Sequence, residues 1–213
     1  MRVKAKENQV KSYSGIATMP GYEMFEYQLV LAVPESLKEK VRRVRSQFAE
    51  VCKVPPASGS VLLPLVKFRQ RALLEERLRF SLGEMITGWC PFLVQLKDFE
   101  AQPTHSIFIP VANKNLIRQH INDLKTIQHL LRPDKEHAAF FSPEHRLYLA
   151  TKLNHGAFEK GWKEYSHRQF TAQFIADACL LLKRKDPTLP WQIAQRFEMR
   201  NLPVGIKQGT LFQ

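Results

Sequence analysis

Hydrophobic and polar side chains alternate along residues 141–153, and this alternation predicts a β-strand with two different faces. Leu147, Leu149 and Thr151 share one face, because successive side chains of a strand point to opposite sides. The other face carries the remaining side chains of the stretch, which are Arg146, Tyr148, Ala150 and Lys152. Two cations and a phenol on one face are suited to lining a cleft, although a half-solvated strand has the same pattern.

The same period of two occurs in several other segments. Strands are predicted at 25–33, 60–69, 92–96, 106–111, 170–175, 178–182 and, beside the last of these, 191–197. Pro64 indicates that its strand lies at an edge or contains a bulge. We expect the strands at 92–96 and 106–111 to form a hairpin across residues 100–104.

Apolar side chains recur at spacings of three and four in four further segments, which is the period of an amphipathic helix. Helices are predicted at 35–51, at 71–87 with Gly88 as the stop, from Asn113 or Asn115 as the cap to about 132, and at 157–165. In the first helix the expected buried stripe is Leu37, Val41, Val44, Phe48 and Val51. Its basic residues are expected to face outward or to flank this stripe: Lys38, Lys40, Arg42, Arg43 and Arg45.

The order of these elements is that of an α+β protein. Two strand–helix–strand units, at 25–69 and at 106–153, indicate an internal repeat. A chain of 213 residues is long enough for one large domain or two small lobes. We expect a basic N-terminal arm at 1–21, one folded domain at 22–200 and a polar C-terminal tail at 201–213.

Composition narrows the class of protein. A net charge of +12 favours a polyanionic partner, nucleic acid first, although a basic protein without such a partner has the same charge. No apolar run is long enough for a transmembrane helix or a signal-peptide core, so a membrane partner is not expected. Three widely spaced cysteines predict reduced thiols in the cytoplasm. No Cys/His spacing typical of zinc occurs, and we expect neither a metal nor a cofactor.

The frame from Arg146 to Ala150 resembles the second signature of the two-histidine (2H) phosphoesterase superfamily, which includes RNA 2',5'-ligase-like proteins and cyclic phosphodiesterases. That signature is a proline-led strand of the form P-H-x-T-h-A, where h is hydrophobic. Arg146 stands at the histidine position and Tyr148 at the threonine position. The segments Phe158 to Tyr165 and Phe170 to Phe174 are similar to a bacterial branch of the superfamily.

The resemblance covers residues 25–185 and implies a two-lobed, pseudo-symmetric 2H-phosphoesterase-like fold. In such a fold antiparallel sheets flank a central cleft, and each lobe contributes one signature strand. The first signature then lies within 60–69, with either Val61 and Leu63 or Leu63 and Leu65 at the histidine and threonine positions. No histidine precedes His105 in the sequence.

The resemblance also implies a reaction, which these substitutions remove. In the superfamily two histidines act as general base and general acid on a 2',3'-cyclic phosphate or a 2'-5' linkage, work that suits imidazole because its pKa lies near neutrality. Apolar side chains cannot transfer a proton, and arginine stays protonated at pH 7. We therefore expect a catalytically inactive protein that binds RNA or a nucleotide. The expected ligand-binding residues are Arg146, Tyr148 and Lys152, with Val61 and Leu63 opposite.

Two alternatives to this function remain open at the level of sequence. One is an active phosphoesterase that uses His105 or His145, although His145 points away from Arg146 unless a bulge reverses the strand. The other is a protein-interaction module without a ligand. Separately, the C-terminal segment resembles the bacterial sliding-clamp-binding peptide Q-x-x-L/M-F, with Gln208, Leu211 and Phe212 as the contact residues. The alternatives to a clamp partner are chance occurrence of so short a motif and docking of this segment on its own domain.

Overall fold

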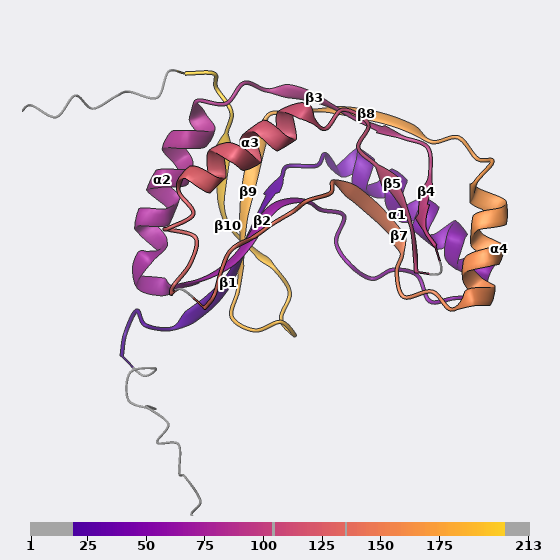
Figure 1. The fold of residues 1–213 in the computed structure, drawn as a ribbon, viewed down its shortest axis with the longest axis horizontal. Coiled ribbons are helices and arrows are strands. Elements are labelled where there is room, and N and C mark those ends of the chain that lie inside the picture. The colour runs from indigo at the N-terminus through magenta and orange to yellow at the C-terminus, as the bar shows by residue number, and fades with distance from the viewer. Residues whose placement is uncertain (1–18, 104, 135, 203–213) are drawn as a thin grey trace, which may run out of the picture.

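The computed structural model describes residues 19–103, 105–134 and 136–202, which form two lobes side by side (Figure 1). Most of the predicted N-terminal arm lies outside the described residues. Most of the predicted tail does so as well, including the three residues of the clamp-binding motif, Gln208, Leu211 and Phe212.

The larger lobe is built on a five-stranded antiparallel sheet with the order β10-β9-β1-β2-β6. Its strands are β1 (Met24–Leu31), β2 (Leu63–Arg71), β6 (Phe140–Phe141), β9 (Ala178–Arg184) and β10 (Gln192–Glu198). The strand predicted at 191–197 is confirmed, and it pairs with β9 as expected. β1 lies at the centre, where Tyr27 and Leu29 are completely buried.

The smaller lobe contains a three-stranded sheet in the order β4-β5-β7, and a two-stranded sheet of β3 and β8 lies beside it. Its strands are β3 (Phe92–Lys97), β4 (Glu100–Gln102), β5 (Ser106–Pro110), β7 (Arg146–Ala150) and β8 (Thr171–Ala176). The predicted hairpin between 92–96 and 106–111 is wrong. β4 and β7 occupy the two edges of β5, so β3 meets this segment at the isolated bridge Leu96–Val111 and pairs with β8 instead.

Four α-helices occur within the described residues, as the hydrophobic period predicts. They are α1 (Glu35–Cys52), α2 (Glu75–Thr87, after a 3-10 turn at Ala72–Leu74), α3 (Asn115–Thr126) and α4 (His155–Tyr165). α3 ends about six residues before the predicted end, and hydrogen-bonded turns follow it, including one from the amide of Leu130 to the carbonyl of Ile127 at 2.8 Å. None of these helices is long and apolar enough to cross a membrane.

Asn113 is one of the two predicted caps for α3, but its side chain forms hydrogen bonds with the backbone of β3. The helix begins after Lys114, without a side-chain cap. The Asn113 side chain instead accepts a hydrogen bond from the Gln95 amide at 2.8 Å and donates one to the Leu93 carbonyl at 2.6 Å. This side chain therefore satisfies backbone groups of β3 that do not pair with β8, a stronger use of the amide than a cap in solvent.

The two predicted strand–helix–strand units are confirmed, and their helices cross between the lobes (Figure 1). In each unit the two strands are antiparallel neighbours, β1 with β2 and β5 with β7. α1, from the first unit, packs against β7 and α4, whereas α3, from the second unit, packs against β2. Each unit therefore covers strands of the other, and the two lobes share their packing.

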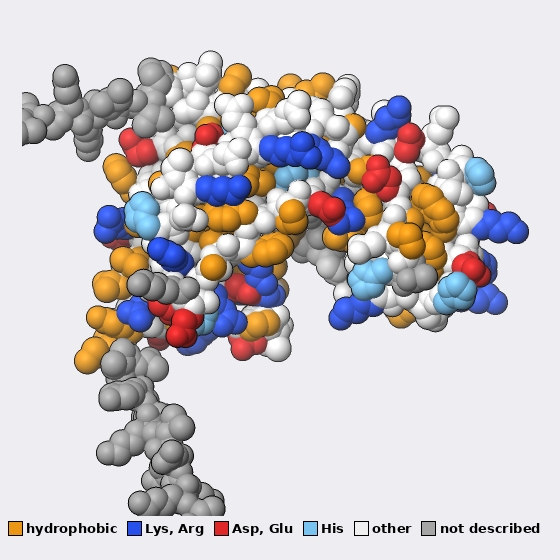
Figure 2. Space-filling model, in the orientation of Figure 1, with side chains coloured by type: hydrophobic (Ala, Val, Ile, Leu, Met, Phe, Trp, Pro, Cys, Tyr) orange, Lys and Arg blue, Asp and Glu red, His pale blue; other side chains and the backbone are white. Residues whose placement is uncertain are grey.

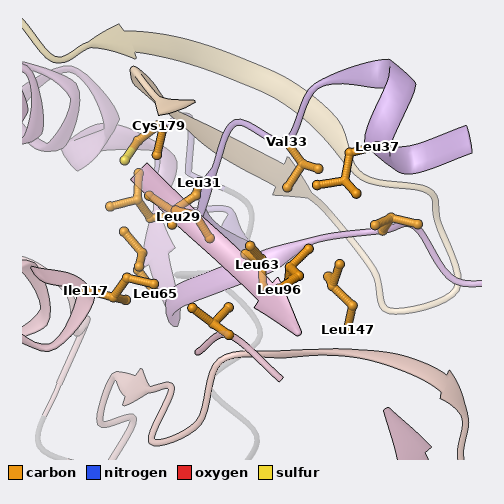
Figure 3. Close-up of a cluster of buried hydrophobic side chains, with 14 of the residues drawn as sticks. Leu29, Leu31, Val33, Leu37, Leu63, Leu65, Leu96, Ile117, Leu147 and Cys179 are labelled. Atoms are coloured by element: carbon orange, nitrogen blue, oxygen red, sulfur yellow. The ribbon is translucent and has the colours of Figure 1, made fainter. Parts of the chain in front are cut away.

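A continuous hydrophobic core follows from this exchange. Figure 3 shows side chains of β1, β2, β3, α3, β7 and β9 in one cluster: Leu29, Leu31, Leu63, Leu65, Leu96, Ile117, Leu147 and Cys179. The three cysteines are free thiols; Cys52 and Cys179 are buried, and Cys90 is exposed. Burial raises the pKa of the Cys179 thiol, so this group behaves as a small hydrophobic side chain.

Arg45 is a buried cation within this arrangement. The prediction that it faces outward with its basic neighbours on α1 is wrong, because its side chain points inward to two backbone carbonyls. Its Nε donates to the Tyr148 carbonyl of β7 at 2.9 Å, and the guanidinium also donates to the Gly59 carbonyl in the loop before β2. Burial lowers the pKa of Arg45, and the charge of Arg42 acts in the same direction.

We expect Arg45→Met to lower the free energy of unfolding by about 1–3 kcal/mol, because two part-buried carbonyls lose a charged donor. Chemical denaturation measures this loss. Arg43→Met is the matched control, since Arg43 is exposed on the same helix and its substitution should change stability by less than about 0.5 kcal/mol. Equal effects of the two variants would contradict the role assigned to Arg45.

Candidate functional site

A cleft of about 340 Å³ separates the two lobes and brings together β1, β2, β6 and β7. It is lined by Gln28, Leu62, Pro64, Phe140, Ser142, Pro143, Glu144, Arg146 and Tyr148. On the face of the molecule in Figure 2, charged and hydrophobic side chains are interspersed and an indentation separates the lobes. The residues contributed by β1 and β2 are uncharged, and the two charges come from the segment that enters β7.

The β7 side of the cleft follows the predicted alternation. Leu147 and Leu149 are buried in the core, and Arg146 and Tyr148 line the cleft. The strand is shorter than predicted, however, and ends at Ala150. Lys152 lies beyond its end with a φ of 54°, is exposed, and does not line the cleft. A cation two residues beyond the strand cannot share the strand face, so the predicted grouping with Arg146 is corrected.

The β2 side has a register that differs from both placements of the first signature, Val61 with Leu63 and Leu63 with Leu65. Val66 pairs with Leu29, and Pro64 pairs with Val30, so Leu65 is an extra, bulged residue. The bulge predicted near Pro64 is thus confirmed. Val61, Leu63 and Leu65 share a buried face by alternation, and the bulge lets Val66, the residue after Leu65, be buried as well. Leu62 and Pro64, rather than Val61 and Leu63, form the cleft wall.

Arg146 is held in place by aromatic rings and one carboxylate. Its guanidinium lies 4.2 Å from the centre of the Phe108 ring and 5.4 Å from that of Tyr148. It forms an ion pair with Glu144, and its Nε has no hydrogen-bond partner among the described residues. The Arg146 side chain is 16% exposed, whereas that of Glu144 is 55% exposed. The cation is therefore fixed, and the carboxylate is free to turn into solvent.

Tyr148 forms a rigid wall of the cleft. Its ring packs edge-on against Phe108 with the ring centres 5.9 Å apart, and Arg45 binds its carbonyl. The residue is 37% exposed, so part of the ring and its hydroxyl remain accessible from the cleft. A phenol can donate a hydrogen bond to a phosphate oxygen or stack on an aromatic ring.

The two histidines proposed as alternative catalytic groups lie away from the cleft. His145 directly precedes β7, is 2% exposed and is absent from the cleft lining. Burial lowers its pKa, with the charges of Lys114 and Arg118 acting in the same direction and the Pro64 backbone opposing them. His145 is therefore a neutral, buried side chain near pH 7. His105 is exposed at the start of β5 and is absent from the cleft lining.

His137 is a residue whose position the sequence did not reveal. It lines two grooves beside the cleft, of about 310 and 480 Å³, together with Arg69. Its Nδ1 lies 2.8 Å from Asp134 Oδ1, and the same oxygen accepts the backbone amide of His137 at 2.8 Å. The imidazole lowers the pKa of Asp134. A loop brings this pair to the edge of the sheet, and no periodic pattern marks such a position.

Glu26 organises the charges between these two grooves. It lies between Lys67, at 2.7 Å, and Arg184, whose Nε donates to it at 2.5 Å. Burial raises the pKa of Glu26, but the hydrogen bonds from Lys67 and Arg184 together outweigh burial and hold the pKa below its ordinary value. Glu26 thus pairs with Lys67, which lines one of the grooves, and with Arg184, which lies outside both linings, while Arg69 remains exposed in both grooves.

The donor set in the described part of the chain does not favour a metal site. Across residues 19–103, 105–134 and 136–202, no group of three histidine, cysteine, aspartate or glutamate side chains could hold a metal ion. The cleft offers, through its own side chains, one guanidinium paired with the Glu144 carboxylate, hydroxyl and amide groups, and aromatic surface.

Comparison with known proteins shows the fold. No family model matches the sequence, and a search of curated proteins finds no significant match. Solved structures with a similar fold include TT0787 of Thermus thermophilus (17% identical, TM-score 0.54, covering 82% of this chain and 98% of that one). They also include E. coli LigT complexed with 3'-AMP, which is 11% identical with a TM-score of 0.56, covering 83% of this chain and 98% of that one. A phosphoesterase is 13% identical with a TM-score of 0.56, covering 83% of this chain and 99% of that one. The two-lobed α+β fold implied by the resemblance to 2H phosphoesterases is thus confirmed.

The charge cluster at Glu26 predicts a defined pH dependence. Because the folded-state pKa is lowered, its stabilising contribution is fully present above the unfolded-state pKa of about 4.3 and is lost as the pH falls through the folded-state value. Glu26→Gln should therefore lower the melting temperature at pH 7 and lower it less at pH 3, where part of the contribution of the carboxylate is lost. Glu39→Gln, at an exposed position on α1, is the control. A Glu26→Gln effect that is equal at both pH values would contradict the assignment.

Proposed function

We propose that this chain is a divergent 2H-phosphoesterase-like protein that binds a phosphorylated ligand, a nucleotide or RNA, in the interlobe cleft without turning it over. The observation that carries this proposal is the composition of the cleft wall. One lobe contributes Leu62 and Pro64, the other contributes Arg146 and Tyr148, and the described residues of the lining include no histidine.

The loss of turnover follows from the chemistry of these four side chains. The superfamily reaction needs two groups that exchange protons near neutral pH. Leucine and proline side chains have no titratable group, and a guanidinium stays protonated. His145 is buried directly before β7 and is absent from the cleft lining, so it cannot reach a ligand in the cleft.

Phosphate binding is supported by the way in which Arg146 is held. Its stacking on Phe108 orients the guanidinium before a ligand arrives, which reduces the entropy lost on binding. A phosphate can replace Glu144, because this half-exposed carboxylate has water as an alternative partner. The Tyr148 hydroxyl and Ser142 offer further polar contacts in the same cleft. E. coli LigT, which has a similar fold, has been crystallised with 3'-AMP, and this supports a nucleotide as the first ligand to test.

Two substitutions at this ion pair should change the affinity for 3'-AMP in opposite directions. Arg146→Ala removes a charge-assisted contact and should weaken binding roughly tenfold to a hundredfold. Glu144→Gln removes the competing carboxylate and should strengthen binding roughly two- to fivefold. Isothermal titration calorimetry at two salt concentrations measures both effects, and the affinity of the wild type should fall as salt rises.

The melting temperature of each variant is the control for this experiment. If Arg146 serves structure alone, Arg146→Ala lowers the melting temperature and leaves the affinity for 3'-AMP unchanged. That result, or tight binding that is insensitive to both variants, would retire the proposed site.

A second candidate function is phosphoester hydrolysis by residues outside the superfamily signatures, and the His137–Asp134 pair favours it. Asp134 engages Nδ1 of the imidazole, which leaves Nε2 available to accept a proton. The exposed cation Arg69 lines the same two grooves and could bind a phosphate. One imidazole supplies a base but no acid, so we place this candidate second.

Turnover of a 2',3'-cyclic nucleotide separates the two candidates. We expect none from the wild-type chain. If turnover occurs, the second candidate requires His137→Gln to reduce it by about 10²-fold or more and Asp134→Asn to reduce it less. His145→Ala is the comparison variant, and loss of turnover in His145→Ala alone would assign catalysis to the buried histidine instead.

A further inference from the structure

Phe140 is a large hydrophobic side chain exposed at the wall of the cleft. It belongs to β6, a strand of two residues that pairs with β2 at Val66 and Lys67. Phe140 is 62% exposed, whereas its neighbour Phe141 is half-buried against the core. An exposed aromatic ring in a cleft lining loses little freedom on binding and offers a large contact area to a ligand.

Tyr148 is the second aromatic ring of the same lining, and it comes from the other lobe. Its orientation is set by Phe108 at its edge, by the Arg146 guanidinium near its face and by Arg45 at its carbonyl. The cleft lining thus includes one aromatic ring from each lobe, the apolar side chains of Leu62 and Pro64, and the Arg146 guanidinium with its partner Glu144.

We propose that the cleft recognises its ligand mainly through a nucleobase, which stacks on Phe140 and contacts Tyr148, while Arg146 binds the attached phosphate. This inference rests on the proposed function of the same cleft, and it assigns Phe140 as the residue that selects an aromatic ligand. A volume of about 340 Å³ has room for one nucleoside. Gln28 and Ser142 supply an amide and a hydroxyl for the polar edge of the base.

The affinities of three probes follow from this division of the contacts. Adenosine, which has the base without phosphate, should bind the wild type, and 3'-AMP should bind more tightly because Arg146 adds its contact. Ribose 5-phosphate, which has phosphate without a base, should bind at least tenfold more weakly than 3'-AMP, since stacking contributes roughly tenfold to a hundredfold in affinity.

Variants of Phe140 test the stacking directly. Phe140→Ala and Phe140→Leu should both lower the affinity for adenosine and 3'-AMP roughly tenfold or more, because neither alanine nor leucine has a π-face. Phe140→Trp should keep the affinity of the wild type, because tryptophan offers an aromatic face for stacking. Ribose 5-phosphate should bind all of these variants equally. Phe80→Ala is the matched control, since Phe80 is also 62% exposed but lies on α2, outside the cleft lining.

The outcomes separate this inference from the proposed function. Binding of 3'-AMP that depends on Arg146 and is unchanged in Phe140→Ala would overturn base recognition and leave the phosphate site intact. Wild-type affinity for 3'-AMP in Phe140→Leu would also overturn base stacking and leave the phosphate site intact, because burial of apolar surface would then explain the contact without an aromatic ring. Absence of binding for all three probes would overturn both proposals.

Discussion

The relation between the two lobes depends on the buried guanidinium of Arg45. α1 originates in the first strand–helix–strand unit, but it packs against β7, which is the edge strand of the smaller lobe. A carbonyl at the unpaired edge of a buried strand needs a donor, and Arg45 supplies one to Tyr148 while it also binds the loop before β2. A single side chain therefore sets the position of one cleft wall relative to the segment that leads into the other.

The two walls of the cleft differ in chemistry for separate structural reasons. On β2 alternation places Leu63 and Leu65 in the core and Pro64 in the cleft lining, and the bulge at Leu65 lets Val66 be buried directly after it. On β7 alternation from Arg146 to Tyr148 places both side chains in the cleft lining before the pairing with β5 shifts at Leu149, and the guanidinium of Arg146 lies over the Phe108 ring. The two walls together give a lining in which one cation is held by an aromatic ring and no described residue is a histidine, and this is the observation on which the proposed function rests.

Local patterns predict most elements, whereas contacts between distant segments decide what the sequence cannot show. β1 and α1 lie close to their predicted ranges because each has a clear period, and β10 also lies close to its predicted range. The predicted partner of β3 is wrong, because strand pairing is chosen by the whole sheet and not by loop length. In the site, Arg146 and Tyr148 follow from alternation alone. The inward turn of Arg45, the one-residue shift at Leu65 and the approach of His137 depend on tertiary packing, which leaves no mark in the hydrophobic period.

The side chain of Asn113 also affects how this protein meets other copies of itself. β3 pairs with β8 on one side, and an open strand edge on the other would offer its amides and carbonyls to any extended chain. Asn113 occupies the Gln95 amide and the Leu93 carbonyl, and the amide of Ala112 occupies the Gln95 carbonyl at 2.8 Å. One carboxamide thus takes the place of a further strand and closes this edge to intermolecular β-sheet growth, the first step toward aggregation.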